Sequence, residues 1–184
     1  MEYKKEDSFV LFFEFLRFCL KEDAKVPANL AEMDWDALYK FGKKQAILGV
    51  LFHGIKKLSE SPYRPNKEQI FKWYGAYSYI EQANKQTYKD ADALTTLLRE
   101  KYGVRSCVLK GQTNALMYPD PYMRTSGDID LWTDAKTLDI IRISRELDSK
   151  GEIGYHHIEL SYFKTPVEVH FFPSFMGNLW HEYK

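Results

Sequence analysis

Two aspartates flank one apolar residue in the segment Gly127-Asp128-Ile129-Asp130-Leu131, which alternates polar and apolar side chains as a strand does. Successive side chains of a strand point to opposite faces, so Asp128 and Asp130 share one face, about 7 Å apart, and the apolar residues face a core. Carboxylates that close repel each other unless a cation lies between them. Because hard oxygen ligands of this kind suit Mg²⁺ or Mn²⁺, the segment predicts a divalent metal site.

The same Asp-x-Asp spacing occurs twice more, at residues 34–36 and 90–92, within segments of helical periodicity. In a helix, positions i and i+2 lie about 200° apart around the axis, so those pairs cannot share an ion. Spacing alone is therefore weak evidence for a metal site. The third copy differs in its strand-like context, and a solvated strand end with two surface acids is the alternative interpretation.

A third acid lies in the alternating segment Val167-Glu168-Val169-His170-Phe171. As a strand, it would send its apolar residues into the core and leave Glu168 and His170 on the opposite face. If it pairs beside the strand of Asp128 and Asp130, three carboxylates converge, and Glu168 becomes a metal ligand and the candidate for preparing an attacking hydroxyl in phosphoryl transfer. A solvated acid is the alternative for Glu168. His170 would orient an acid, contact phosphate, bind metal or satisfy a backbone group.

Two further motifs and one arginine accompany these segments. The full set is Val108-Leu109-Lys110-Gly111, Tyr118-Pro119-x-Pro121, Arg124, Gly127-Asp128-Ile129-Asp130-Leu131 and Val167-Glu168-Val169-His170. Together these motifs resemble the uncharacterised nucleotidyltransferases of the DNA polymerase β-like superfamily. The resemblance covers residues 104–172 strongly and the N-terminal half more loosely. It implies a small mixed sheet flanked by helices, a metal bound by Asp128 and Asp130, and Glu168 as the third acid.

The chain departs from the superfamily pattern at one position, since Gly111 is followed by Gln112 where many members carry serine to grip a triphosphate. Three residues offer replacements for that contact. Lys110 carries a point charge, Gly111 has a backbone that phosphate can approach closely, and the guanidinium of Arg124 can donate two hydrogen bonds to phosphate oxygens. Each also has a purely structural interpretation, as a strand end, a helix cap or a surface ion pair with Asp120. The candidate nucleotide-binding residues are therefore Lys110, Gly111, Arg124, Gly127 and His170.

Apolar periodicity predicts an α+β fold, in which a helical N-terminal region is followed by a small mixed sheet flanked by helices. Residues 1–102 form the helical region, ending in a long helix, and residues 103–184 form a nucleotidyltransferase-like α/β core with a possible truncation at its C-terminus. Asp34 and Asp134 are predicted helix caps. Helices are expected over 8–20, 35–40, 43–58, 67–102, 112–118 and 135–147, and strands over 104–109, 128–132, 156–163 and 167–172, the last two joined as a hairpin.

Composition restricts the partners. Lys+Arg and Asp+Glu both number 26, so no global positive field favours nucleic acid, and a small-molecule or protein substrate is favoured. The resemblance implies a nucleoside triphosphate as one partner, with a small-molecule or protein acceptor. Cys19 and Cys107 are interpreted as reduced core residues.

The apolar run 9–20 is too short to span a bilayer and no leader accompanies it, which favours the cytoplasm. His156 and His157 have no acid at zinc-site spacing and receive no metal role.

The favoured function is a metal-dependent nucleotidyltransferase, which moves a nucleoside monophosphate from NTP to a hydroxyl or phosphate acceptor with Mg²⁺ or Mn²⁺ as cofactor. An inactive binding or regulatory module of the same fold is the first alternative. A metal-dependent sugar-nucleotide glycosyltransferase is the second, although about 100 largely helical residues before the motif argue against it. Residues 174–184 resemble the start of a helix or lid.

Overall fold

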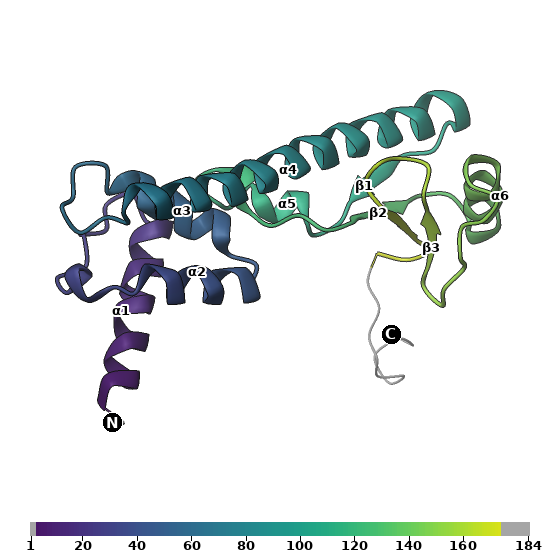
Figure 1. Ribbon diagram of the computed structural model, residues 1–184. Helices are drawn as coiled ribbons and strands as arrows, with labels where there is room; N and C mark the ends of the chain where they lie inside the picture. The colour runs from purple at the N-terminus through teal and green to yellow at the C-terminus, as the bar shows by residue number, and fades with distance from the viewer. Residues whose placement is uncertain (1–2, 174–184) are drawn as a thin grey trace. The chain divides into compact units, whose positions relative to one another are not determined.

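The computed structural model of the protein describes residues 3–173, where six α-helices and a four-stranded mixed sheet make the expected α+β fold (Figure 1). The helix or lid expected over 174–184 lies outside the described residues. Among the described helices, none has the length and apolar character needed to cross a bilayer. The elements are α1 (Tyr3–Leu20), α2 (Trp35–Lys44), α3 (Leu48–Lys57), α4 (Lys67–Tyr102), β1 (Ser106–Val108), α5 (Gln112–Ala115), β2 (Ile129–Thr133), α6 (Thr137–Leu147), β3 (His157–Leu160) and β4 (Val167–His170), with 3₁₀ turns η1 (Leu30–Glu32) and η2 (Pro121–Met123).

The chain forms two compact units. The first comprises the residues up to 84 together with 115–125, and the second comprises 85–114 together with the residues from 126 onward. The long helix expected over 67–102 is confirmed as α4, about 50 Å long at 1.5 Å per residue, and it contributes to both units. The expected division into domains after residue 102 stays a prediction.

The first unit is built on helices α1, α2, α3 and the first part of α4. The sequence predicted a buried stripe on α1 that includes Phe9 and Phe13, but these side chains are 53% and 59% exposed. Phe15 and Phe18 are buried instead, with Trp73 of α4 in the same core. Phe12 and Cys19 of the predicted stripe are buried, so the prediction was wrong only in part. Apolar residues are so numerous in this helix that periodicity could not choose between two overlapping faces.

A break in the backbone separates α2 from α3, where one helix had been expected over 43–58. Ala46 has φ 56°, a left-handed conformation that ends α2, and the Ile47 N–H donates to the Gly42 carbonyl. The start of α2 is as predicted, because the Asp34 carboxylate accepts hydrogen bonds from the N–H groups of Asp36 and Ala37.

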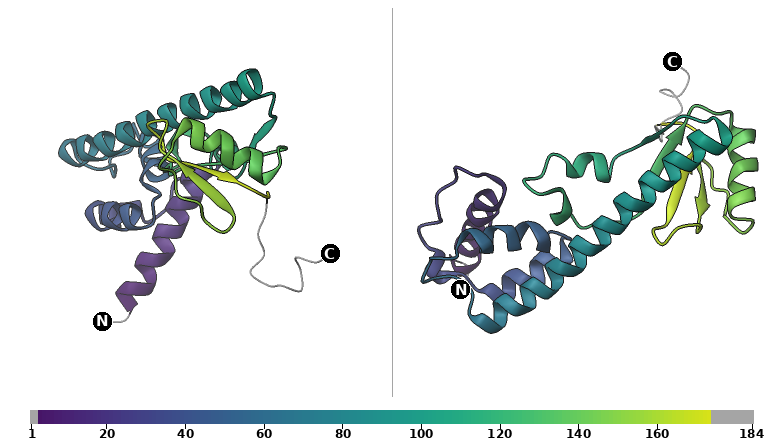
Figure 2. Two further views of the ribbon diagram at one scale, coloured as in Figure 1. Left: turned by 90° about the vertical axis from the view of Figure 1, so that its right-hand side faces the viewer. Right: turned by 90° about the horizontal axis from the view of Figure 1, so that it is seen from above.

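The second unit contains the sheet, whose strand order is β1-β2-β4-β3. Strand β2 runs parallel to β4, whereas β1 and β3 lie antiparallel at the two edges, so β3 and β4 form the expected hairpin. One face of the sheet is apolar and packs with the second half of α4 and with α6; Figure 2 shows α6 against the strands. The core residues of this unit are Ala91, Leu94, Leu98, Val104, Ile129, Leu131, Ile140, Ile143, Ile158, Leu160, Val167 and Val169.

Two details of the second unit correct the sequence analysis. Strand β1 is an edge strand with an exposed Cys107, not a buried strand, because no further strand pairs with it within residues 3–173. Cys19 is buried as expected, and burial raises the pKa of its thiol to about 12. Asp134 does not cap α6. Its carboxylate accepts hydrogen bonds from the N–H and the guanidinium of Arg105, and Lys136 occupies the cap position.

Candidate functional site

The polar face of the sheet brings two of the predicted acids together. In the parallel pairing of β2 with β4, Asp130 lies directly opposite Glu168, and Trp132 lies opposite His170. The neighbours of Asp130 and Glu168 along each strand belong to the apolar core, so the alternation that buries Ile129 and Val167 also places both acids on the other face. Strand β4 therefore pairs directly with β2, which is the condition that the sequence set for bringing Glu168 close to Asp130.

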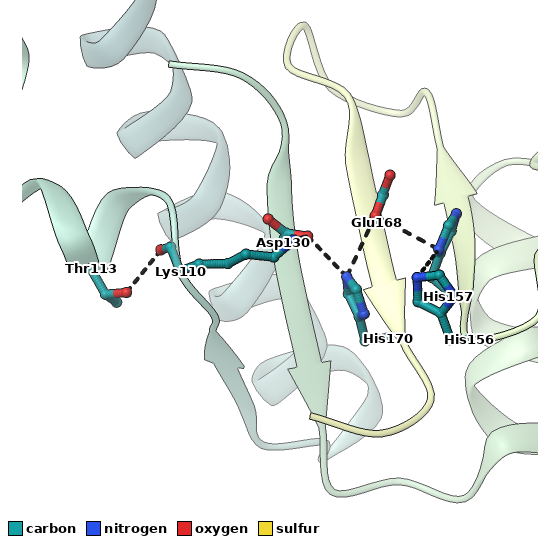
Figure 3. A network of polar contacts seen from close by, with 7 residues as sticks. All are labelled: Lys110, Thr113, Asp130, His156, His157, Glu168 and His170. Atoms are coloured by element: carbon teal, nitrogen blue, oxygen red, sulfur yellow. Dashed lines mark hydrogen bonds and ion pairs between the residues drawn. The ribbon is translucent and has the colours of Figure 1, made fainter. Parts of the chain in front are cut away.

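Asp130 is the centre of a polar network on this face (Figure 3). Its side chain is 6% exposed, and its Oδ1 accepts from the Lys110 ammonium at 2.9 Å and from the His170 Nε2 at 3.0 Å. The same His170 nitrogen lies 3.5 Å from Glu168 Oε2. His170 thus lies within contact distance of both acids, and orienting an acid is one of the several roles that the sequence left open for it.

Lys110 shows that the acids create a site for a cation. Its pKa is raised, first by the hydrogen bond to Asp130 and then by the charges of Asp130, Asp128 and Glu168, while partial burial opposes the shift. All three predicted acids therefore act on one ammonium group. Among the described residues, the ligand atoms of Asp130, Glu168 and His170 lie within 4.8 Å of one another, and the two carboxylates of this set suit Mg²⁺ or Mn²⁺.

The two aspartates of the motif are not equivalent. Asp130 belongs to β2 and its residue is 4% exposed, whereas Asp128 lies just before the strand and is exposed. Gly127 is exposed beside it, and nothing lies within 4 Å of the position that a Cβ would take there. The segment 127–128 is therefore open to a solvent-borne ligand, while Asp130 is held in place by its neighbours.

The turn that carries Lys110 has an unusual backbone. Lys110 and Gly111 have φ values of 23° and 50°, and the Lys110 carbonyl accepts hydrogen bonds from the N–H and the hydroxyl of Thr113. A left-handed conformation favours glycine at position 111, and the space beside Gly111 is open. Gln112, the departure from the superfamily serine, is buried, and its side-chain amide has no hydrogen-bond partner within the described part of the chain.

Arg124 belongs to the first compact unit, so its part in phosphate binding stays a prediction. Within that unit its backbone is firmly held, because the buried Asn84 amide donates to the carbonyls of Tyr122 and Arg124 at 2.8 and 2.6 Å. The Asp120 carboxylate accepts from the Tyr77 hydroxyl and from the Tyr122 N–H.

Two histidines near the acids were not assigned a role from the sequence. His157 lies opposite His170 on β3, and its Nδ1 is 3.7 Å from Glu168 Oε2 and 3.1 Å from His156 Nε2. No acid lies at zinc-site spacing from these histidines in the sequence, and Glu168 comes from the neighbouring strand. Only the register of the β3–β4 hairpin could have revealed this contact.

Asp90 of α4 supports the segment that leads into β4. Its carboxylate accepts from the N–H and hydroxyl of Thr165 at 2.9 and 2.8 Å and from Gln86 at 2.8 Å, and the residue is 5% exposed. We expect Asp90→Ala to lower the free energy of unfolding by about 2–3 kcal/mol, because it leaves buried donors without an acceptor. The matched change Asp92→Ala, at an exposed position of the same helix, should have little effect. Urea unfolding of both variants would check this, and equal midpoints would contradict it.

A small mixed sheet flanked by helices, with paired acids on its polar face, defines a nucleotidyltransferase-like fold. A family model described as uncharacterised nucleotidyltransferase matches residues 31–174, and the chain belongs to this family. The match confirms the resemblance drawn from the sequence motifs and gives the protein a general role in nucleotidyl transfer. No curated protein and no solved structure matches the chain.

Proposed function

We propose that the protein is a metal-dependent nucleotidyltransferase that moves a nucleoside monophosphate from NTP to a hydroxyl or phosphate acceptor. The observation that carries the proposal is the register of β2 and β4, which places Asp130 opposite Glu168. The negative charges of these two acids and of Asp128 all raise the pKa of Lys110, after the larger effect of its hydrogen bond to Asp130. In this proposal Asp128, Asp130 and Glu168 hold Mg²⁺ or Mn²⁺, which would neutralise charge on the triphosphate.

The protein's own residues would bind and orient the reactants. Lys110 carries a positive charge for phosphate oxygens, and the open backbone at Gly111 and Gly127 allows phosphate to approach closely. Lys110 now donates to Asp130, so the arrival of a metal would release its ammonium for the phosphates. Glu168, at 27% exposure of its side chain, is reachable by an acceptor hydroxyl and is the base in this proposal.

The test is to incubate the purified protein with ATP, GTP, CTP or UTP, with Mg²⁺ or with EDTA, and to measure pyrophosphate release and thermal stability. The proposal expects release with at least one nucleotide, only when the metal is present. A ligand at 100 times its dissociation constant adds about 2.7 kcal/mol of stability, so binding is seen independently of turnover.

A binding module without turnover is the second candidate, and Gln112 is the observation that favours it. This residue replaces the serine that grips triphosphate in many superfamily members, and its buried amide makes no described hydrogen bond. That candidate expects stabilisation by nucleotide and Mg²⁺ without pyrophosphate release, which would contradict the catalytic proposal in the same experiment.

A further inference from the structure

A second group of metal-binding side chains lies beside the acids. It consists of His156, in the bend before β3, His157, the first residue of β3, and Glu168 of β4. Each offers one ligand atom, and the three atoms lie within 4.8 Å of one another. All three residues are half-buried, so the group is partly shielded from bulk water.

Two of the distances within the group are close to those around a tetrahedral ion. Zinc binds histidine nitrogen at about 2.0–2.1 Å and carboxylate oxygen at about 2.0–2.2 Å, which separates neighbouring ligands by about 3.3 Å. His157 Nδ1 lies 3.1 Å from His156 Nε2, to which it is hydrogen-bonded, and 3.7 Å from Glu168 Oε2, so one distance is slightly shorter than this separation and the other slightly longer. The two imidazole rings are arranged edge to face, with their planes at 82° and their centroids 4.5 Å apart.

We propose that His156 Nε2, His157 Nδ1 and a Glu168 oxygen bind a transition-metal ion of the zinc type, with a fourth position left to water. Two imidazoles and one carboxylate are a ligand set that zinc uses in proteins, whereas Mg²⁺ prefers oxygen ligands alone. The site is therefore chemically distinct from the carboxylate centre. The sequence did not reveal it because adjacent strand residues were expected to point to opposite faces, and His156 precedes β3 and lies in a bend.

Glu168 links the two centres. Its Oε2 lies 3.7 Å from His157 Nδ1 and 3.5 Å from His170 Nε2, and His170 in turn contacts Asp130. An ion on the histidines would hold Glu168 on the β3 side and away from a metal at Asp130. This regulatory consequence, inhibition of nucleotidyl transfer by zinc, rests on the proposed function, whereas the binding site itself does not.

The binding test uses Co²⁺ as a spectroscopic probe for zinc, titrated into the full chain at neutral pH without nucleotide. We expect one Co²⁺ per chain with the intense visible absorption of tetrahedral coordination, displaced by Zn²⁺ and not by Mg²⁺. His156→Gln, His157→Gln and Glu168→Gln should each weaken binding at least roughly tenfold. His53→Asn, which removes an imidazole from the first unit, should bind like the wild type.

Asp128→Asn separates this proposal from the proposed function. Asp128 is exposed and belongs to the carboxylate centre alone, so the variant should retain Co²⁺ binding and lose nucleotide turnover. Loss of Co²⁺ binding in Asp128→Asn, or equal Co²⁺ binding by the wild type and a folded His156→Gln, would overturn the histidine site. Circular dichroism of each variant establishes that it is folded before titration.

Discussion

Asp130→Asn is expected to lower the rate of pyrophosphate release by about 100-fold or more. Removing one metal-binding charge from such a centre costs several kcal/mol of transition-state stabilisation, and each 1.36 kcal/mol is about tenfold in rate. In the wild type, Lys110 Nζ lies 2.9 Å from Asp130 Oδ1. Asparagine keeps the shape of the side chain and an oxygen that can still accept a hydrogen bond from Lys110. The loss should therefore come from the missing charge and not from a changed fold.

Steady-state turnover over a range of Mg²⁺ concentrations would check this expectation, because a lost ligand also raises the Mg²⁺ concentration needed for half-maximal rate. Glu159→Gln is the matched control. Glu159 lies opposite Glu168 on the adjacent strand, its side chain is 57% exposed, and its carboxylate lies 3.8 Å from His157 Nε2. Turnover by Asp130→Asn at the level of this control would show that Asp130 does not hold the metal.

Gly49→Ala is expected to destabilise the first compact unit by about 2–3 kcal/mol. A Cβ at Gly49 in α3 would overlap the carbonyl oxygen of Met123 and lie 2.8 Å from its carbonyl carbon, and Met123 is fully buried. Alanine favours a helix over glycine by at most about 1 kcal/mol, which does not offset a collision with backbone that cannot rotate away.

Gly75→Ala is the matched change in α4, where nothing lies within 4 Å of the added methyl group. This variant should be more stable than the wild type by about 0.5–1 kcal/mol, since only the helix preference acts. Thermal unfolding of the two variants should thus shift Tm in opposite directions, downward for Gly49→Ala by about 5–10 °C. Shifts of the same sign and size would refute the close approach of α3 to Met123.

The close approach at Gly49 also fixes the backbone next to Arg124, because Met123 immediately precedes Arg124 in the chain. The segment from Asp120 to Arg124 is held by the approach of α3 and by the Asn84 amide, which donates to two of its carbonyls.

The sequence by itself determined the elements with strong, one-sided patterns. Helix α4 could be predicted over its whole length because a proline-free run repeats with helical period, and β2 and β4 could be predicted because their apolar residues alternate with acids. Alternation also determined that Asp130 and Glu168 point away from the core. Patterns failed where they were ambiguous: the apolar residues of α1 are too numerous to define one face, and the apolar strand β1 proved to be an edge strand.

The tertiary structure decided which of these residues meet. The pairing of β2 with β4, separated by more than 30 residues, sets Asp130 opposite Glu168, and the hairpin register sets His157 opposite His170. No local pattern encodes such a register, because it depends on how the apolar faces of all four strands fit against α4 and α6. The sequence thus supplied the acids and their faces, while long-range strand pairing produced the charge cluster around Lys110 and the histidine group beside it.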